Sequence, residues 1–409
     1  MTRAQLIKKL GALGLTEPMY GTGHNGRVLN SDLEDVISEH FAQSLTTWGQ
    51  KARYSLGNVM LAARYDECTE QERELLFSDD SPWYMEEKYN GVRITLFAHP
   101  DEGFSAFSRN RSKVTCLPLE YTRNILVPDD GSWRHLYEVT PHGGAAMIDC
   151  ELVTGGFVEL PDGTFATGLQ AVTSVLSQDD PEVAAHMQRT TCPLTLVAFD
   201  FLPANEDGTL LLGEVFGTRR ELLQEWAANN PSVLTGKLHS RNKESIYSQY
   251  LDSGKEGVVF KHEQGLYVPA RNNRRDRNTC VKCKRSMRGA GTSDIDVWIG
   301  GAYATPEWSK RGLIGGLELY TYLDNGDERT VHNIANVASM PDEMRIALSR
   351  NGDLNPEYLG AVITIDGQDV SARNRKITHA RADWKRGFRQ DKSESDCVLD
   401  EEFLNSQIF

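Results

Sequence analysis

The stretch MEEKYNGVR, residues 85–93, contains a lysine that could act as a nucleophile. Lys88 stands two residues before Asn90 and Gly91, between two apolar, strand-like runs, WYMEEKY and VRITLF. Asn-Gly readily adopts the positive φ angles of a type I′ turn, so one interpretation is a hairpin with Lys88 on its surface. The other interpretation is that the lysine amine is positioned to attack an electrophile. Residues elsewhere in the chain must decide between the two.

Two carboxylates share one face of a predicted strand in the run AMIDCELV. Successive side chains of a strand point to opposite faces. Ile148, Cys150 and Leu152 therefore face one way, whereas Asp149 and Glu151 face the other. The same run is compatible with an edge strand that has one solvated face.

Three further strand-like runs also carry side chains that could bind or react with a ligand. The run EGVVFKH begins with Glu256, and alternation in LVAFDFL predicts that Phe199 points away from Asp200. In CVKCK the same alternation places Lys282 and Lys284 side by side. Together with Lys88, these runs provide a nucleophile, acidic groups suited to a hard cation or a sugar hydroxyl, a ring that could stack on a base, and two lysines for phosphate. This combination suits an attack on a nucleotide.

The elements that must position these residues predict an antiparallel α+β fold with three parts. Residues 31–48 carry helical apolar spacing, with Ser31 as the expected N-cap and Glu34 answering it three residues later. Strands without regular β-α alternation follow, including a hairpin at 100–103. After RGAGTSD, about 120 residues of short strands and Gly-rich turns suggest a small barrel of the kind that binds oligonucleotides. The expected domains are a small helical segment (1–55), a catalytic domain (56–288) and an OB-fold barrel (289–409).

Composition and charge narrow the class of protein. The chain has 409 residues, 39% of them hydrophobic, and a net charge of −14, which argues against indiscriminate coating of nucleic acid. A local exception is the basic run 270–288, in which eight Arg or Lys residues accompany a single Asp; it is either a phosphate-binding surface or a solvated charge run. Seven cysteines indicate reduced thiols, and Cys280 and Cys283 are expected to be packing residues. No apolar run is long enough to cross a membrane and no leader is apparent, so an intracellular setting is expected.

In their order and spacing, these elements resemble the ATP-dependent DNA ligases of the covalent nucleotidyltransferase superfamily, especially the compact bacteriophage type. The resemblance runs from about Val59 to near the C terminus. EEKYNGVR resembles the K-x-D-G-x-R motif that carries the adenylated lysine, FSRNRSK the arginine motif that follows it, and MIDCELV the D-G-E motif. LVAFDFL resembles the base-stacking motif, KEGVVFK the E-G-[IVL]-[IVM]-x-K element, CVKCK the terminal K-x-K, and FRQDK the R-x-D-K motif of the OB domain.

The resemblance implies a role for each matching residue. Lys88 would take AMP, and Glu256 would bind Mg²⁺, with Asp149 as a second expected metal ligand. The remaining implied nucleotide contacts are Glu86 at the adenine amino group, Arg93 and Arg109 at phosphate or sugar, Glu151 at the ribose, Phe199 on the adenine ring, and Lys282 and Lys284 at the α-phosphate. Arg389, Asp391 and Lys392 would move over the pyrophosphate during the first step.

Two positions depart from the family pattern. The usual Asp of the lysine motif is Asn90, which is either a natural variant or a replacement, and the usual Gly of D-G-E is Cys150. Cys150 faces away from the carboxylates and affects the interpretation little. Asn90 removes a negative charge beside the nucleophile, so we expect adenylylation of Lys88 to survive and nick sealing to be slower.

The implied chemistry requires a neutral lysine amine, and nearby cations favour it: Lys282, Lys284 and a bound Mg²⁺. ATP would supply the AMP, and the expected partner is nicked duplex DNA, held through its phosphates with little sequence choice by the basic run and the barrel. A monomer is expected. The alternatives are an RNA ligase or mRNA capping enzyme, which share the lysine, acidic and K-x-K elements, and a non-catalytic nick-binding protein that has lost activity through Asn90.

Overall fold

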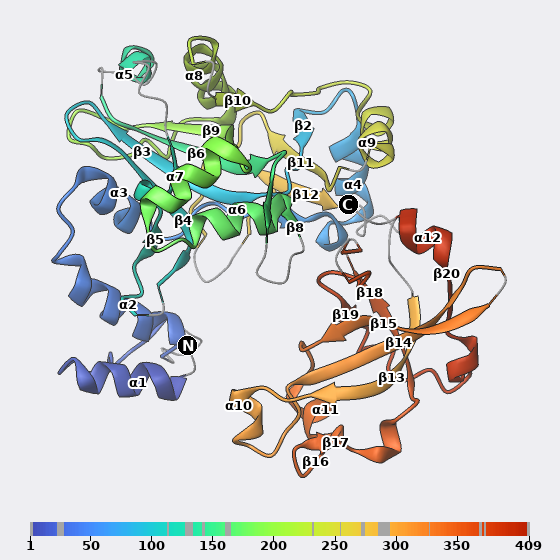
Figure 1. The fold of residues 1–409 in the computed structure, drawn as a ribbon. Helices are drawn as coiled ribbons and strands as arrows, with labels where there is room; N and C mark the ends of the chain where they lie inside the picture. The colour runs from blue at the N-terminus through green and yellow to red at the C-terminus, as the bar shows by residue number, and fades with distance from the viewer. Residues whose placement is uncertain are drawn as a thin grey trace. The chain divides into compact units, whose positions relative to one another are not determined.

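A computed structural model describes residues 3–22, 28–112, 114–126, 134–140, 144–159, 165–230, 233–253, 255–270, 275–284, 295–326, 328–367, 370–371 and 374–406. The chain divides into two compact units, Met1–Lys282 and Cys283–Phe409, which are described separately (Figure 1). The division falls inside a strand, and the expected boundary near residue 288 lies outside the described residues. Residues 1–55 belong to the first unit.

The first unit contains two main sheets in which antiparallel pairing predominates. A six-stranded sheet has the order β10-β9-β6-β3-β4-β5, and a four-stranded sheet has the order β1-β12-β11-β2. The strands of the first are β3 (Val92–His99), β4 (Gly103–Arg111), β5 (Pro118–Glu120), β6 (Ala146–Thr154), β9 (Leu194–Pro203) and β10 (Val233–Thr235). Those of the second are β1 (Ala63–Arg64), β2 (Trp83–Glu87), β11 (Gly257–His262) and β12 (Cys280–Lys284). The predicted mixed α and β character with antiparallel sheets is confirmed.

The two predicted hairpins have different outcomes. β3 and β4 pair antiparallel from Ile94↔Ser108 to His99↔Gly103, which confirms the hairpin at 100–103. The hairpin through Asn90 and Gly91 is wrong, because β2 pairs with β11 whereas β3 pairs with β4 and β6. Local turn propensity was overridden by pairing with strands distant in sequence. Lys88 therefore lies where the chain passes from one sheet to the other.

Apolar alternation determines which face of the six-stranded sheet is covered by helices. Ile94, Ile148, Cys150 and Leu152, all 0% exposed, pack in one core with residues of three helices. These helices are α5 (Arg134–Val139), α6 (Gly168–Leu176) and α8 (Phe216–Ala228). The opposite face carries a second core that includes Phe97, Met147 and Tyr267. The polar side chains of β6 therefore point toward this second face, as predicted.

Three N-terminal helices, α1 (Arg3–Ala12), α2 (Asn30–Ala42) and α3 (Trp48–Leu56), precede the sheets. Leu6, Leu10, Leu33 and Ile37 bury their side chains together with Cys116 of the β4–β5 connection. The helical spacing at Leu33 and Ile37 is confirmed, but the expected cap at Ser31 is wrong. Asp32 makes the terminal contact instead, accepting a hydrogen bond of 2.6 Å from Leu29 N–H and another of 2.8 Å from the Thr22 hydroxyl.

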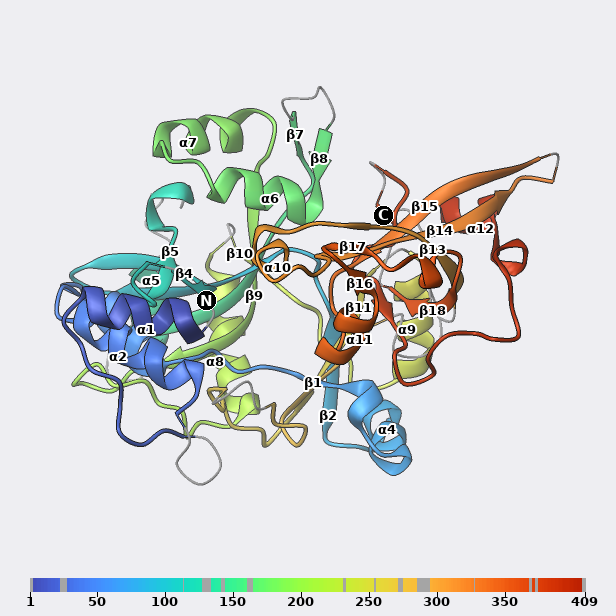
Figure 2. The ribbon, with the colours of Figure 1, turned by 90° about the horizontal axis from the view of Figure 1, so that it is seen from below.

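Smaller elements complete the first unit (Figure 2). They are the short helices η2 (Tyr65–Glu67) and η3 (Thr122–Asn124), the helices α4 (Glu70–Phe77), α7 (Pro181–Thr190) and α9 (Lys243–Asp252), and a separate hairpin of β7 (Phe157–Glu159) and β8 (Phe165–Thr167). Figure 2 shows α6 and α7 lying beside this hairpin. All seven cysteines are buried, and no disulfide joins any of them in the described part of the chain. That the thiols stay reduced is still a prediction.

The second unit is built on one sheet of order β15-β14-β13-β18-β19, with β20 paired to β14. Its strands are β13 (Ile295–Tyr303), β14 (Gly316–Asp324), β15 (Arg329–Val337), β18 (Val362–Asp366), β19 (Arg381–Ala382) and β20 (Val398–Asp400), beside a small hairpin of β16 (Ser349–Arg350) and β17 (Asp353–Leu354). The helices are α10 (Pro306–Ser309), α11 (Asp342–Ala347), α12 (Glu401–Ser406), η6 (Pro356–Tyr358) and η7 (Glu394–Asp396). Val297, Ile299, Leu317 and Ile363, each fully buried, belong to its core.

Among the described residues, no helix is both long enough and apolar enough to cross a membrane.

Candidate active site

Lys88 forms the centre of the site through a partly buried ion pair. Its Nζ lies 2.6 Å from Glu256 Oε2, and the side chains are 22% and 8% exposed. Lys88 follows directly after β2, and its backbone N–H donates to Gly257 O at 2.9 Å, which extends the β2–β11 pairing by one residue. The backbone register therefore brings the lysine and the glutamate together from positions 168 residues apart. This geometry rules out the interpretation of Lys88 as a surface lysine beside a tight turn.

Glu151 lies close to the same pair. Burial raises its pKa to about 7, the charge of Glu256 acts in the same direction, and Lys88 and Arg93 oppose it. Its Oε1 accepts a hydrogen bond of 3.2 Å from Gly91 N–H. A Cβ at position 91 would lie 2.2 Å from Leu152 O, so only glycine allows this close approach of the loop to β6. The Asn-Gly pair thus serves a strand contact rather than a hairpin turn.

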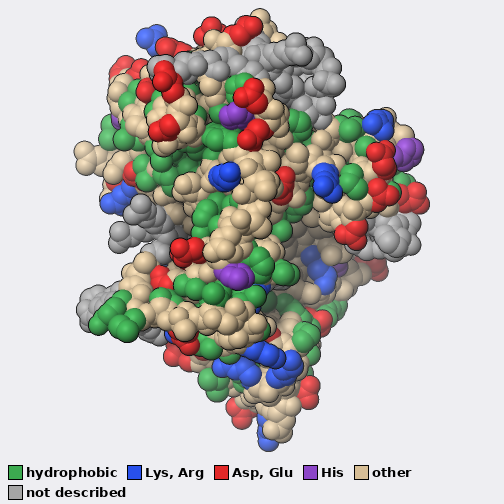
Figure 3. Space-filling view, turned by 90° about the vertical axis from the view of Figure 1, so that its left-hand side faces the viewer, with side chains coloured by type: hydrophobic (Ala, Val, Ile, Leu, Met, Phe, Trp, Pro, Cys, Tyr) green, Lys and Arg blue, Asp and Glu red, His purple; other side chains and the backbone are tan. Residues whose placement is uncertain are grey.

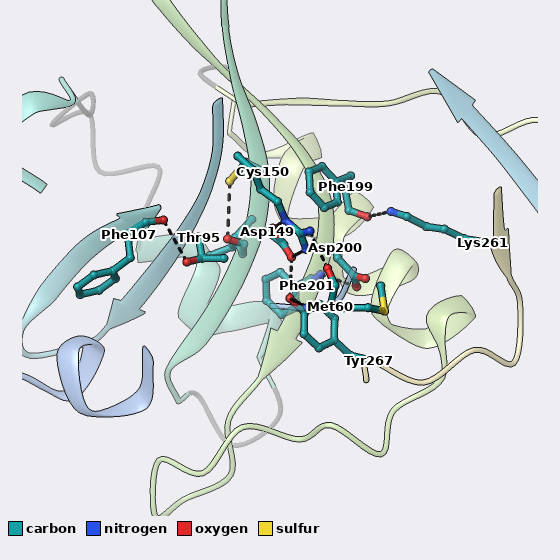
Figure 4. A network of polar contacts seen from close by, with 12 residues as sticks. Met60, Thr95, Phe107, Asp149, Cys150, Phe199, Asp200, Phe201, Lys261 and Tyr267 are labelled. Carbon is teal, nitrogen blue, oxygen red and sulfur yellow. Dashed lines mark hydrogen bonds and ion pairs between the residues drawn. The ribbon is translucent and has the colours of Figure 1, made fainter. Parts of the chain in front are cut away.

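Arg93 is held by the other carboxylate of β6. Its Nε donates to Asp149 Oδ1 at 2.8 Å, and its Nη1 donates to Met60 O at 2.6 Å. Although burial lowers the pKa of Arg93, the charge and hydrogen bonds of Asp149 outweigh it and leave the pKa raised. Tyr267 also donates to Asp149, at 2.7 Å (Figure 4).

These contacts bear on Asp149 as an expected metal ligand. The carboxylate is 0% exposed, and both oxygens accept hydrogen bonds from Arg93, one of them also from Tyr267. A carboxylate saturated in this way is a structural partner of a guanidinium. Glu256 and Glu151 are the carboxylates that lie beside Lys88, so Asp149 is not carried into the metal site proposed below. Among the residues described, no group of three or more His, Cys, Asp or Glu could hold a metal.

Phe199 occupies an irregular position in β9. Asp149 pairs with Asp200 and Cys150 pairs with Ala198, which leaves Phe199 as an extra residue. An extra residue interrupts side-chain alternation and redirects the strand. The ring lies 5.4 Å from Arg93 Cζ, on the same face as Asp149 and the cross-strand Asp200. The predicted opposition of Phe199 and Asp200 is therefore wrong, although Phe199 does lie beside the other site residues (Figure 4).

Glu86 points into a buried cluster of charges. It is 3% exposed, and its Oε1 lies 2.6 Å from Lys261 Nζ. Its Oε2 has no hydrogen-bond partner among the described residues and lies 3.9 Å from Nη1 of Arg220, another buried side chain. Lys261 also donates to Phe199 O at 2.6 Å. A buried acceptor without a donor marks a position that a ligand could complete.

The predicted lysine pair lies on β12, next to β11. Val281 and Cys283 are buried while Lys282 and Lys284 are partly exposed, which agrees with the predicted alternation. Cys280 and Cys283 are 4% and 0% exposed, in agreement with a packing role. Arg109 is exposed near the end of β4.

Only part of the basic run is described. Within residues 275–284, Arg275 lies 3.6 Å from Glu67 and Arg277 lies 3.3 Å from Glu72. These two arginines are therefore paired with acidic side chains of η2 and α4. Acidic and basic side chains are also interspersed over the upper part of the face drawn in Figure 3. The phosphate-binding role of the run remains a prediction.

In the second unit, the predicted residues Arg389, Asp391 and Lys392 gather around Asp296 of β13. Arg389 Nη1 lies 3.2 Å and Lys392 Nζ lies 2.5 Å from Asp296 Oδ2. Arg389 also binds Asp391, at 2.7 Å. Although burial raises the pKa of Asp296, hydrogen bonds from Lys392 and Thr364 keep it below its usual value.

Sequence reasoning gave no role to Tyr267 and Lys261, which contact site residues of the first unit, or to Asp296, which contacts Arg389 and Lys392 within the second unit. Lys261 could have been identified, since it is the last residue of the quoted KEGVVFK element. Tyr267 and Asp296 carry no local signal, because each meets its partner across a long sequence separation, for example 118 residues between Tyr267 and Asp149.

Comparison with known proteins gave a family and a fold. A model described as the ATP dependent DNA ligase domain matches residues 59–284. A solved structure named Pmar-Lig_PreS3 is 14% identical and has a TM-score of 0.54, with 89% of this chain and 73% of that chain covered. No curated protein matched the sequence.

Two further structures are similar at lower TM-scores. One, from a structure-function study of Lig E DNA ligases, is 16% identical, covers 80% of this chain and 97% of that chain, and has a TM-score of 0.45. The other, an ATP-dependent DNA ligase from bacteriophage T7 in complex with ATP, is also 16% identical, with the same coverage and a TM-score of 0.38.

Proposed function

The chain belongs to the family of ATP-dependent DNA ligases, and from that premise we propose that it seals nicks in duplex DNA through an AMP carried on Lys88. The observation that carries this proposal is the 2.6 Å contact between Lys88 Nζ and Glu256, beside Glu151 and Arg93. In the first step Nζ attacks the α-phosphorus of ATP, a P–N bond forms, and the P–O bond to pyrophosphate breaks. AMP then passes to the 5′-phosphate at the nick, and the adjacent 3′-hydroxyl displaces it.

The residues of this chain would divide the work of the first step. Glu256 lies at hydrogen-bond distance from Nζ and would place the metal ion beside it. Lys282 and Lys284 would disfavour the ammonium form of Lys88 and would stabilise charge on the α-phosphate. Arg93, Arg109 and Glu151 would contact sugar and phosphate, while Phe199 and Glu86 would hold the adenine. The unpartnered Oε2 of Glu86 supports this last assignment, since an adenine amino group is a donor.

The carboxylates beside Lys88 suit Mg²⁺, which binds through one or two carboxylates together with substrate phosphates. Glu256 would hold the ion, which would neutralise phosphate charge during transfer. Reaction at an ATP phosphate depends mainly on positioning and electrostatics.

We assign the parts of the chain as the helical segment 1–55, the adenylation domain 56–288 and an OB-fold domain 289–409. The second unit's sheet, in which every pair except β14–β20 is antiparallel, supports an OB fold. Arg389, Asp391 and Lys392 would act at the pyrophosphate, and the basic run with the OB domain would hold the nicked duplex through its phosphates. The protein would act as a monomer in an intracellular setting, where ATP is present and cysteines stay reduced.

Incubation with α-labelled ATP and Mg²⁺ tests the central step. We expect an acid-labile, base-stable label that maps to Lys88, and no label in Lys88→Arg. Lys237→Arg, a change at an exposed lysine outside the site, should label normally.

Three outcomes would contradict the proposal. Labelling from GTP rather than ATP would indicate a capping enzyme, and sealing confined to RNA strands would indicate an RNA ligase. Binding of nicked duplex without any covalent adduct would indicate a non-catalytic nick-binding protein.

A further inference from the structure

Tyr267 is a buried tyrosine with no role in the reaction proposed above. It is 1% exposed and belongs to the segment that connects β11 to β12 in the sequence. Its hydroxyl donates to Asp149 Oδ2 at 2.7 Å and accepts from Met60 N–H at 3.3 Å. Burial, reinforced by the charge of Asp149, raises the pKa of Tyr267 well above its ordinary value, so the hydroxyl retains the proton that it donates.

Tyr267 and Arg93 share two hydrogen-bond partners, Asp149 and Met60. Arg93 donates to the same two residues, through Nε to Asp149 at 2.8 Å and through Nη1 to Met60 O at 2.6 Å. The guanidinium therefore bonds the Asp149 carboxylate and the Met60 carbonyl, while Tyr267 bonds the same carboxylate and the Met60 N–H. Figure 4 shows Tyr267, Asp149 and Met60 side by side. If the Tyr267 hydroxyl were lost, the fully buried Asp149 carboxylate would keep, among the described residues, only its hydrogen bonds from Arg93. The carboxylate and the guanidinium could then rotate together.

The position of Tyr267 is set independently of Arg93. Arg219 of α8 lies with its Cζ 5.9 Å from the tyrosine ring and donates to Gly265 O at 3.1 Å. Arg219 is itself fixed by a buried ion pair of 2.7 Å with Asp200. The tyrosine is thus also packed against α8, by contacts that do not involve Arg93.

Arg93 connects this network to the other predicted site residues. Its Cζ lies 5.4 Å from the Phe199 ring, and Arg93 is the cross-strand partner of Glu151, which adjoins Lys88. We propose that Tyr267 is a positioning residue that orients Arg93, through Asp149 and Met60, toward a sugar hydroxyl of ATP. This inference rests on the proposed function and extends it to nucleotide selection.

The test is the nucleotide preference of Tyr267→Phe. Single-turnover formation of the lysyl adduct is measured with ATP, 2′-deoxy-ATP and 3′-deoxy-ATP, giving a maximal rate constant and a half-saturating concentration for each. For ATP we expect the maximal rate constant divided by the half-saturating concentration to fall about tenfold, the effect of one lost hydrogen bond. The fall should come from a higher half-saturating concentration. For the deoxy nucleotide that lacks the contacted hydroxyl, we expect a fall below about threefold.

Two controls separate positioning from a general loss of packing. Tyr247→Phe, at a tyrosine that is 3% exposed and packs on Phe77, should leave the preference among the three nucleotides unchanged. In an Arg93→Lys background, Tyr267→Phe should have little further effect, because the group that it orients is gone. If Tyr267→Phe folds poorly, Asp149→Asn, which weakens the same hydrogen bonds at constant size, should change the preference in the same direction.

The outcomes that overturn the inference are distinct from failure of the proposed function. Equal losses for all three nucleotides, or full additivity with Arg93→Lys, would show that Tyr267 does not act through Arg93. If the wild-type protein forms no lysyl adduct with any nucleotide, the proposed function fails and this inference fails with it.

Discussion

At the scale of single residues, the site depends on which side chains surround each of the two carboxylates of β6. Asp149 and Glu151 share one face, yet Asp149 is saturated by Arg93 and Tyr267 while Glu151 has a pKa raised to about 7. Alternation along the strand was sufficient to predict the common face. It could not predict the division of roles, because the partners of Asp149 come from segments far away in sequence.

Glu151 should make the stability of the protein depend on pH. Because the pKa of Glu151 is raised, the folded state favours the protonated carboxyl. The stabilisation that this carboxyl gives the folded state is fully present below its pKa in the unfolded chain, about 4.5, and is lost as pH rises through its pKa in the folded protein, about 7. The free energy of unfolding of the wild type relative to Glu151→Gln should therefore fall by about 2–3 kcal/mol between pH 5 and pH 8.

Urea unfolding of both proteins at several pH values would measure this difference. Glu221→Gln, at an exposed position of α8, is the matched control and should show no such dependence. A constant difference between wild type and Glu151→Gln over this pH range would contradict the raised pKa.

Asn90 offers a second prediction at this scale. The residue is exposed, so Asn90→Asp adds a negative charge near Lys88 without a packing penalty. We expect sealing of a pre-adenylylated nick to become faster by on the order of tenfold, which corresponds to roughly 1.4 kcal/mol of transition-state stabilisation. Adenylylation of Lys88 should proceed in both proteins. Equal sealing rates would show that Asn90 is incidental.

At the scale of elements, local pattern predicted the strands well but not their partners. The runs 92–99, 146–153 and 280–284 were predicted as strands and are strands. The common face of Asp149 and Glu151 and the alternation of buried and partly exposed residues in 280–284 are as expected. The Asn-Gly hairpin and the orientation of Phe199 were wrong for one common reason. Both depend on pairing between β2 and β11 or between β6 and β9, and a long-range register leaves no trace in a local run.

Gly91 tests the contact that joins the Lys88 loop to β6. Gly91→Ala would place a Cβ 2.2 Å from Leu152 O, so backbone must shift, and we expect a loss of at least about 2 kcal/mol in the free energy of unfolding. Adduct formation on Lys88 should fall as well. Gly155→Ala is a suitable control, because a Cβ there meets nothing within 4 Å. Similar denaturation midpoints for the two variants would show that the loop can move at little cost.

At the scale of the whole molecule, a protein of net charge −14 must bind a polyanion through local basic surfaces. The described arginines of the basic run are held by Glu67 and Glu72 in exposed or partly exposed ion pairs. Such pairs contribute little free energy and can be exchanged for phosphate contacts. The composition indicated the basic run, but the acidic residues facing it lie about 200 positions earlier in the chain and could not be matched to it by sequence.

Salt dependence of nick binding tests this surface. Affinity of the wild type should fall steeply as salt rises, because each phosphate contact releases counterions. In the double variant Glu67→Gln, Glu72→Gln, the freed arginines should tighten binding at low salt and make the slope of log affinity against log salt steeper by about 1 to 2. Glu221→Gln with Glu225→Gln makes the same change in net charge at exposed positions of α8 and should alter the slope less. A flat salt response of the wild type would refute the phosphate clamp.

The passage of the chain between two sheets at residues 88–91 has a mechanical consequence. β2 ends one residue before Lys88, and β3 begins one residue after Gly91. The backbone therefore connects Lys88 to both sheets within a few residues on each side. A shift of one sheet against the other would move the lysine amine, so the spacing between the sheets would control how the proposed nucleophile approaches phosphorus.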